Sequence, residues 1–291
     1  MILVTAANGN QGRLLIPRLL AAGVGFRALV RSEESGKALR AVGVTDVVVG
    51  DAGDPDVLAA AMNGVEKVYF IGPALHPKER EMGFAAIDTA RAAGVEHFVF
   101  SSVLHAIVTD LVQHEIKRDL EEHLVTSGLE FTILQPANYM LRHRLVPAFT
   151  EGTFRLSWAL ERYQSMVHLG DVTEVAAAIL TDTPAHAGAT YELVAPGRYT
   201  AHDLAAVIAT VCGRAVAAER IDSESFLKAA LGVDNLDQFP YEARVLRAID
   251  DRYSSHDFIG NPNVLTWLLG RSPTTFEQFV RDEFAAFRST S

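Results

Sequence analysis

Short apolar runs alternate with amphipathic segments through the first half of the sequence. Such runs are typical of strands buried on both faces of a parallel sheet, and the segments between them have apolar residues at helical spacing. The alternation predicts a doubly wound α/β fold with helices on both faces of the sheet. The expected strands are 2–4, 25–30, 47–49, 68–71, 97–100 and 131–134. The expected helices between them are 13–20, 32–41, one starting at residues 54–55, 78–93 and 115–127.

The pattern changes after residue 136. Shorter and mostly helical segments predict a smaller substrate-binding lobe, packed intimately against the sheet. We therefore expect a dinucleotide-binding domain over 1–141, to which later segments can add a strand and a helix, and a lobe over 142–291. The lobe should contain a segment of mixed structure over 140–149 and strands over 166–169 and 191–194. Two of its helices should start at Asp171 and at Thr200, and two more should cover 223–231 and 241–249. The last helix has an apolar stripe attributed to packing: Phe276, Phe279, Val280, Phe284 and Phe287.

The turn after the first strand has a nucleotide-binding spacing. Ala6, Gly9 and Gly12 recur every third residue between a buried strand and a helix start. Such a turn aims backbone N–H groups at one point, which the helix dipole makes favourable for a pyrophosphate. Alanine is the smallest replacement for glycine, although it disfavours most positive φ angles. An ordinary strand-to-helix turn is the alternative. The turn residues assigned to cofactor binding are Ala6, Asn8, Gly9, Asn10, Gln11 and Gly12.

The ends of the following strands supply side chains suited to a dinucleotide. Arg31, after the second strand, can form two hydrogen bonds to the ribose 2′-phosphate of NADP, where an acidic residue would select NAD. NADP(H) is therefore expected, and NAD(H) stays an alternative. Asp51 can accept from the adenine amino group, and Gly72 leaves room for a ribose or a phosphate. The expected cofactor site also includes Ser32, Lys37, Ala52, Ile71, Pro73, Ser101, Pro136 and Asn138.

Composition argues against several other functions. Lys and Arg number 26 against 36 Asp and Glu, a formal net charge of −10, which disfavours a nucleic-acid partner bound through its phosphates. No apolar run is long enough to span a membrane. The single cysteine, Cys212, permits neither an intrachain disulfide nor a cysteine-based zinc site, and its apolar surroundings predict a buried thiol. His143 and His168 lack metal-ligand spacing. With no targeting leader before the first strand, a cytoplasmic location is expected.

Longer motifs follow the glycine turn in order. They are TAANGNQG, GDAGD, IGP, FVFSSVLH, HEIK and LEFTILQPANYM, then more loosely MVHLGDVTEVAAAIL, ATYELV and LLGRSPTTFEQFV. Together they resemble the NmrA-like group of atypical short-chain dehydrogenase/reductase proteins. The resemblance implies a Rossmann fold, usually NADP(H), and a smaller C-terminal substrate lobe. The group includes quinone, phenolic-ether and dye reductases, and also dinucleotide-binding proteins that regulate transcription through a protein partner without turnover.

The resemblance also implies an incomplete catalytic pair. Short-chain dehydrogenases usually combine a tyrosine acid with a lysine four residues later, and Lys117 stands in the lysine's place while Gln113 stands in the tyrosine's. Lys117 would then hold the nicotinamide ribose. Proton donation by His114 and hydrogen bonding to the substrate by Ser102 compete with turn or capping roles. The expected catalytic residues are Lys117, His114 and Ser102, and the expected substrate-pocket residues are His105 and Tyr139, the latter with core packing as its alternative.

Three functions are compatible with these residues. The first is an NADPH-dependent reductase of a flat, apolar carbonyl substrate such as a quinone or an enone. A quinone needs little acid help because its ring stabilises the reduced oxygens, so the missing tyrosine is tolerable. The second is an NADP(H)-sensing regulatory protein without turnover. The third, weaker alternative is a tailoring role in aromatic metabolism coupled to an oxygenase. A small-molecule substrate is expected, and a homodimer or a protein partner is left open.

Overall fold

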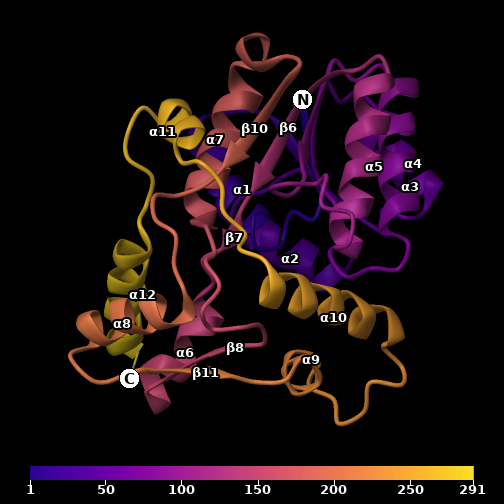
Figure 1. The fold of residues 1–291 in the computed structure, drawn as a ribbon. Helices are drawn as coiled ribbons and strands as arrows, with labels where there is room; N and C mark the ends of the chain where they lie inside the picture. Colours follow the sequence, from indigo (N-terminus) through magenta and orange to yellow (C-terminus); the bar gives the residue numbers. More distant parts are fainter. Residues whose placement is uncertain (291) are drawn as a thin grey trace. The chain divides into compact units, whose positions relative to one another are not determined.

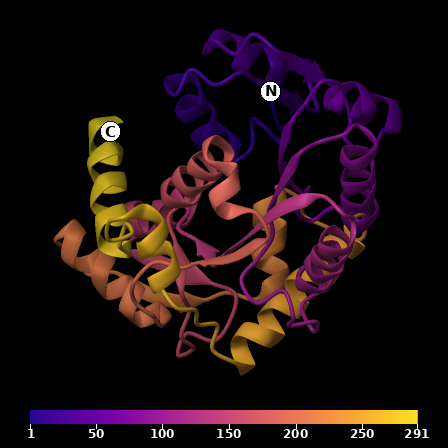
Figure 2. The ribbon, with the colours of Figure 1, turned by 90° about the horizontal axis from the view of Figure 1, so that it is seen from above.

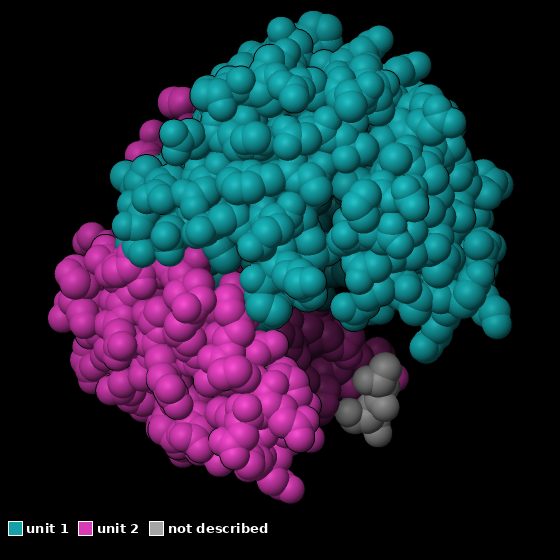
Figure 3. Space-filling view, turned by 90° about the vertical axis from the view of Figure 1, so that its right-hand side faces the viewer, with its two compact units in different colours: residues 1–109, 113–136, 169–192 teal, residues 110–112, 137–168, 193–291 magenta. Residues whose placement is uncertain are grey.

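The computed structural model describes residues 1–290, which form two compact units (Figure 3). The first unit contains Met1–Thr109, Gln113–Pro136 and Leu169–Glu192. The second contains Asp110–Val112, Ala137–His168 and the chain from Leu193 onward. The units are therefore interleaved along the sequence. The chain leaves the first unit after Pro136, and the later segment Leu169–Glu192 adds a helix and a strand to that unit.

A seven-stranded sheet lies at the centre of the first unit, within the described part of the chain. Its order is β10-β6-β5-β4-β1-β2-β3, and the pairings from β3 through β6 are parallel. Strands β1 to β3 extend the sheet in one direction and strands β4 to β6 extend it in the other, so the strand order reverses between β1 and β4. This reversal confirms the expected doubly wound, Rossmann-type architecture. The strands are β1 Ile2–Val4, β2 Phe26–Val30, β3 Val47–Val49, β4 Lys67–Ile71, β5 His97–Ser101, β6 Glu130–Pro136 and β10 Ala189–Leu193.

Helices cover both faces of this sheet (Figures 1 and 2). α3, α4 and α5 lie on one face, and α1 and α7 pack together on the other. The helices are α1 Gly12–Ala21, α2 Glu33–Ala41, α3 Pro55–Met62, α4 Glu79–Ala92, α5 Val112–Thr126 and α7 Leu169–Thr181, with a 3₁₀ turn at Thr183–His186. The six expected strands and the helices between them are present, with ends shifted by a few residues.

The apolar runs form the core of the first unit, as their pattern indicates. Leu3 and Val4 of β1 are fully buried, as is Leu15 on the inner face of α1. The ring of Phe70 in β4 lies 5.7 Å from that of Phe98 in β5. Burial of the strands on both faces fixes the positions of their carboxyl ends, where the polar connections begin.

The second unit combines short strand pairs with helices. β7 Asn138–Tyr139 pairs with β9 Met166–Val167, and β8 Thr153–Leu156 pairs with β11 Ala217–Arg220, both in parallel. The helices are α6 Arg142–Glu151, α8 Ala201–Cys212, α9 Ser223–Leu231, α10 Pro240–Ser255, α11 Asn263–Leu269 and α12 Phe276–Thr290. The structure confirms the expected aromatic packing on α12, because Phe276 and Phe279 are buried and the Phe284 ring lies 5.2 Å from that of Phe149.

Three local expectations for the later part of the chain were wrong. The segment expected to be mixed forms α6, whose pattern Pro147 obscures, and the helix ends at Gly152 in a left-handed conformation with φ +74°. Asp171 does not precede its helix, since α7 already starts at Leu169 and the carboxylate lies in the first turn. Cys212 is only partly buried at the end of α8. The capping box of Thr200 and Asp203, by contrast, confirms the expected start of α8.

Candidate cofactor and active site

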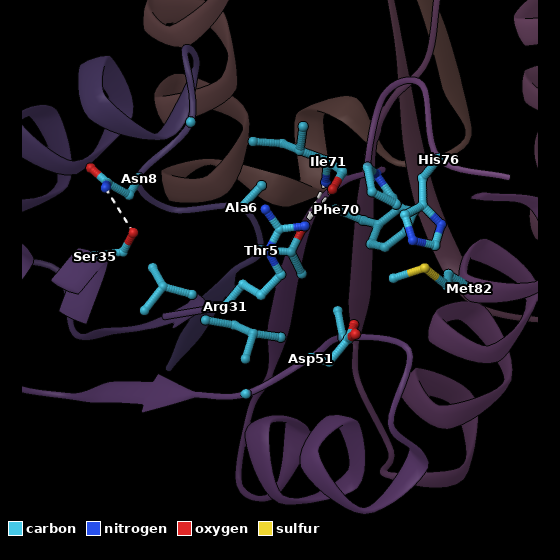
Figure 4. Close-up of a pocket in the computed structure, with 16 residues that line it drawn as sticks. Thr5, Ala6, Asn8, Arg31, Ser35, Asp51, Phe70, Ile71, His76 and Met82 are labelled. Atoms are coloured by element: carbon cyan, nitrogen blue, oxygen red, sulfur yellow. Dashed lines mark hydrogen bonds between the residues drawn. The ribbon is translucent and has the colours of Figure 1, made fainter. Parts of the chain in front are cut away.

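A cavity of about 260 Å³ opens in the first unit where the strand order reverses. Its walls come from the residues that follow β1, β2, β3 and β4 (Figure 4). In doubly wound sheets, ligands bind in this crevice outside the carboxyl ends of the strands. The cavity brings together eight residues expected to bind the cofactor: Ala6, Asn8, Gly9, Arg31, Asp51, Ala52, Ile71 and Pro73. Sequence reasoning missed Thr5, Ser35, His76 and Met82, which also line it.

The glycine turn forms the first wall of the cavity. The Gly9 N–H donates to the Ala6 carbonyl at 2.8 Å, which closes the turn. Ala6 has φ +47° and therefore occupies the left-handed region, although alanine disfavours it. A Cβ added at Gly12 would lie 2.3 Å from the carbonyl oxygen of Ala7, so only glycine lets α1 start this close to the turn. The two glycines thus serve the turn and the helix packing.

Several expected cofactor residues tie this turn to its neighbours. Asn8 donates to Ser35 Oγ at 3.0 Å and accepts from Arg13 Nε at 3.1 Å. Ser32 is the N-cap of α2, because its Oγ accepts from the Ser35 N–H at 3.2 Å. Asn10 and Lys37 are exposed and do not line the cavity. Ser32, Asn10 and Lys37 therefore lie outside the group that the cavity assembles.

Arg31 and Asp51 bring opposite charges to the cavity. Figure 4 shows the Arg31 side chain extending into it from the end of β2. Within residues 1–290, the Arg31 guanidinium has no ion pair or hydrogen bond to another side chain. Asp51 Oδ1 accepts from the Gly53 N–H at 2.8 Å, which orients the carboxylate after β3. The arrangement leaves a planar cation available to an anionic group in the cavity.

Gln11 and Ser101 form a buried network rather than part of the cavity wall. Gln11 Nε2 donates to Ser101 Oγ at 2.9 Å, and the Tyr69 hydroxyl donates to Gln11 Oε1. All three residues are buried. The network joins the residue before α1 to β4 and β5, and it thereby fixes the start of α1 relative to the sheet.

Lys117 forms an ion pair that the sequence did not reveal. Its Nζ lies 2.7 Å from Glu79 Oε1, and the Glu79 side chain is 1% exposed. The same ammonium lies 5.1 Å from the centre of the Phe100 ring. A Cβ added at Gly72 would lie 3.0 Å from both Glu79 Oε1 and Lys117 Nζ, so Gly72 leaves space for the pair. Glu79, the first residue of α4, has no motif that identifies it in the sequence.

Ser102 belongs to a second cluster on the same face of α5. Its hydroxyl donates to Glu121, and Gln135 Nε2 donates to both Glu121 carboxylate oxygens at 2.9 Å. Burial raises the pKa of Glu121, while the hydrogen bonds from Ser102 and Gln135 and the charge of Lys117 oppose that rise. Glu121 follows Lys117 by four residues, and this spacing is the sequence feature that could have associated them.

The two histidines of the expected site contact each other through the backbone. His114 is 4% exposed, and its Nδ1 donates to the His105 carbonyl at 3.0 Å, so the hydrogen of a neutral ring lies on Nδ1. His105 has φ +56°, and its Nε2 lies 3.7 Å from Glu192 Oε1. Gln113 Oε1 is buried without a hydrogen-bond partner in the described chain. In the position of the usual tyrosine, Gln113 thus provides a hydrogen-bond acceptor and not an acid.

The remaining expected residues lie at the end of β6 and beyond it. Pro136 is the last residue of β6 and accepts from the Leu104 N–H at 2.9 Å. Asn138 and Tyr139 form β7 of the second unit. Asn138 Nδ2 donates to Gln164 Oε1 at 2.8 Å, and its Oδ1 accepts from the Tyr253 hydroxyl at 3.3 Å. Both polar atoms of Asn138 are therefore used within the second unit.

Across 1–290, no three His, Cys, Asp or Glu side chains gather in a way that could hold a metal ion. In the same span, no helix has the length and apolar character needed to cross a membrane.

A doubly wound sheet with a charged cavity at its switch point is the architecture of a Rossmann-type dinucleotide-binding protein. The model of the NmrA-like family matches residues 1–256, and the chain belongs to this family. It is 31% identical to NAD(P)H azoreductase of Xenophilus azovorans, with 99% of each chain covered. It is 27% identical to quinone oxidoreductase 2 of Escherichia coli K12, with 98% of this chain and 99% of that protein covered.

A solved structure with the same fold is the Citrobacter sp. triphenylmethane reductase in complex with NADP(H). Its TM-score is 0.82 at 26% sequence identity, and the match covers 97% of this chain and 100% of that one. These relatives extend over both units, so the second unit belongs to the shared architecture.

Proposed function

We propose that this protein is an NADPH-dependent reductase of flat, apolar aromatic or quinone-type substrates. The observation that carries the proposal is the Arg31 guanidinium, which extends into the switch-point cavity without a side-chain partner in the described chain. The similarity to an azoreductase, a quinone oxidoreductase and a triphenylmethane reductase supports a reductase of aromatic compounds. A cytoplasmic location is part of the same proposal.

The cavity residues fit the adenosine end of NADP(H). Arg31 would bind the ribose 2′-phosphate through two charge-assisted hydrogen bonds, and Asp51 would accept from the adenine amino group. The backbone N–H groups at the start of α1 would receive the pyrophosphate. Bound NADPH would supply the hydride for the reduction.

The proton would come from the cluster on α5. Lys117 is fixed by Glu79 and would orient the nicotinamide ribose through its remaining N–H groups. If Glu121 takes up a proton, its O–H would donate to Ser102 Oγ, and the Ser102 O–H would then turn towards the substrate oxygen and donate to it. Proton transfer from Glu121 through Ser102 Oγ to the reduced substrate would not need a tyrosine at position 113.

The test is anaerobic mixing of the protein with NADPH and a panel of quinones, azo dyes and triphenylmethane dyes. We expect oxidation of NADPH, followed by its absorbance, at rates well above those without protein. Binding of NADPH without oxidation by any member of the panel would contradict the reductase proposal.

A second candidate function is an NADP(H)-sensing protein that acts through a protein partner without turnover. The observation that favours it is Gln113, whose buried acceptor replaces the usual acid. Equal affinity for NADP⁺ and NADPH, together with partner capture that depends on the cofactor, would support this function. A clear preference for NADPH with turnover would reject it.

A further inference from the structure

A second, smaller cavity lies wholly inside the second unit. Its volume is about 10 Å³, which is room for a single group about the size of a water molecule. Its walls come from β7, α6, β8, β9 and α8. Nothing in the proposed reductase mechanism uses this cavity.

Three nitrogen atoms on its walls are buried and have no hydrogen-bond partner within residues 1–290. They are Arg144 Nε, Trp158 Nε1 and Gln164 Nε2. Trp158 is 6% exposed and Gln164 is 3% exposed. An N–H group buried without an acceptor is strongly unfavourable, so three of them around one cavity require an explanation.

A chain of hydrogen bonds includes the Gln164 amide. The Tyr253 hydroxyl donates to Asn138 Oδ1, and Asn138 Nδ2 donates to Gln164 Oε1. The carbonyl side of the Gln164 amide is thereby used, which leaves its N–H₂ group as the unpartnered side. The three unpartnered polar atoms on the cavity wall are therefore all hydrogen-bond donors.

Arg144 adds a positive charge that no carboxylate balances in the described chain. Its guanidinium lies 5.6 Å from the Trp158 ring, and burial lowers the pKa of Arg144. The guanidinium nevertheless remains charged at neutral pH. Other arginines of this unit do have acidic partners, as in the pairs Arg142–Glu283 and Arg155–Glu151. The side chain of Arg144 is partly buried, with Nε fully buried, and it has no counter-charge in the described chain.

We propose that this cavity binds a single small anion with the size and charge of chloride. A water oxygen accepts two hydrogen bonds, whereas a halide can accept from all three donors and also neutralises Arg144. A cavity of about 10 Å³ is too small for an aromatic substrate. Bound halide would stabilise the second unit, since it binds the folded chain and not the unfolded one.

The two tryptophans of the chain permit a direct test, because Trp267 is 74% exposed and Trp158 lines the cavity. In a Trp267→Phe variant, Trp158 is the sole tryptophan, and bromide is titrated against gluconate at constant ionic strength. We expect saturable quenching of Trp158 fluorescence. Arg144→Met in the same background should remove the saturable component, and Arg142→Met, on the same helix, should retain it. Quenching that rises only linearly with bromide, or saturation that survives Arg144→Met, would overturn the proposal.

A second measurement does not depend on the folding of any variant. We expect the unfolding temperature of the wild-type protein to be higher in chloride or bromide than in gluconate at equal ionic strength, and to level off as the halide concentration rises. Equal unfolding temperatures in halide and gluconate would also reject the site.

Discussion

Individual residues decide which cofactor and which chemistry this protein can accept. Arg31 provides a cation without a side-chain partner in the described part of the first unit, whereas Lys117 is already paired with Glu79. The two cations therefore differ in what a substitution leaves behind. Removal of Arg31 leaves no buried charge, whereas removal of Glu79 leaves the Lys117 ammonium largely buried without its counter-charge.

Arg31→Ser should weaken NADPH binding and leave NADH binding nearly unchanged, because only NADPH carries the 2′-phosphate. Loss of charge-assisted hydrogen bonds worth about 1.5–3 kcal/mol corresponds to a roughly 10- to 100-fold rise in Kd. Fluorescence titration with both cofactors measures the effect. Arg40→Ser is the matched control, because Arg40 is exposed and pairs with Glu33 on α2. An equal loss for NADH would contradict the assignment.

Glu79→Gln should lower the free energy of unfolding by about 3 kcal/mol, since it leaves the Lys117 ammonium largely buried without its counter-charge. Urea unfolding measures this loss. The double variant Glu79→Gln with Lys117→Met should recover much of it, because both charges are then absent. Additive losses in the double variant would show that the ion pair contributes little.

At the level of secondary-structure elements, the position of the site depends on how closely α1 approaches the turn and on how strands pair. Gly12 and the buried network of Gln11 and Ser101 hold α1 against the sheet. At the other end of the sheet, His97 of β5 contacts Thr132 of β6. We expect the first contact to affect cofactor binding and the second to affect stability alone.

Gly12→Ala should destabilise the protein by about 1–3 kcal/mol and impair NADPH binding, because its Cβ would lie 2.3 Å from the Ala7 carbonyl oxygen and displace α1. Gly25→Ala is the control, since a Cβ there meets nothing within 4 Å. Thermal unfolding and cofactor titration of both variants test this. Wild-type binding by Gly12→Ala would disprove the close-packing argument.

His97 should make stability depend on pH below neutrality. Burial, aided by the charges of Lys67 and His186, lowers its pKa from 6.5 to about 4. Thr132 Oγ1 donates to the His186 carbonyl, so His97 Nε2–H donates to Thr132 and a second proton would lie on the buried, unpartnered Nδ1.

Because the pKa of His97 is lower in the folded chain than in the unfolded chain, neutral His97 contributes to the free energy of unfolding. This contribution is full above about pH 6.5 and is lost as the pH falls towards about 4. The contribution is about 3 kcal/mol at most. His97→Gln should flatten the pH dependence of unfolding between these values. An unchanged pH dependence in the variant would show that His97 does not titrate with folding.

At the scale of the whole molecule, the two units, interleaved along the sequence, each contain one of the two cavities. The switch-point cavity belongs to the first unit, and the proposed anion cavity belongs to the second. Family relatives match nearly the full length of the chain, so both units are part of one shared design.

NADP⁺ should raise the stability of the intact protein by about 2.7 kcal/mol at a hundredfold excess over its Kd, because it binds the folded chain alone. Thermal unfolding with increasing NADP⁺ measures this effect. Arg31→Ser should require a correspondingly higher concentration for the same shift. No shift with NADP⁺ at any concentration would argue against the cavity as a cofactor site.

The sequence alone determined the doubly wound sheet, because alternating apolar strands and amphipathic helices have few other ways to bury their apolar faces. It also located Arg31 and the glycine turn, since a strand end and a helix start are local features. The interleaving of 169–192 with the first unit, the pairing of Glu79 with Lys117 and the cluster around Glu121 depended on the tertiary structure. These contacts join residues distant in sequence, and their partners follow from packing rather than from any local pattern.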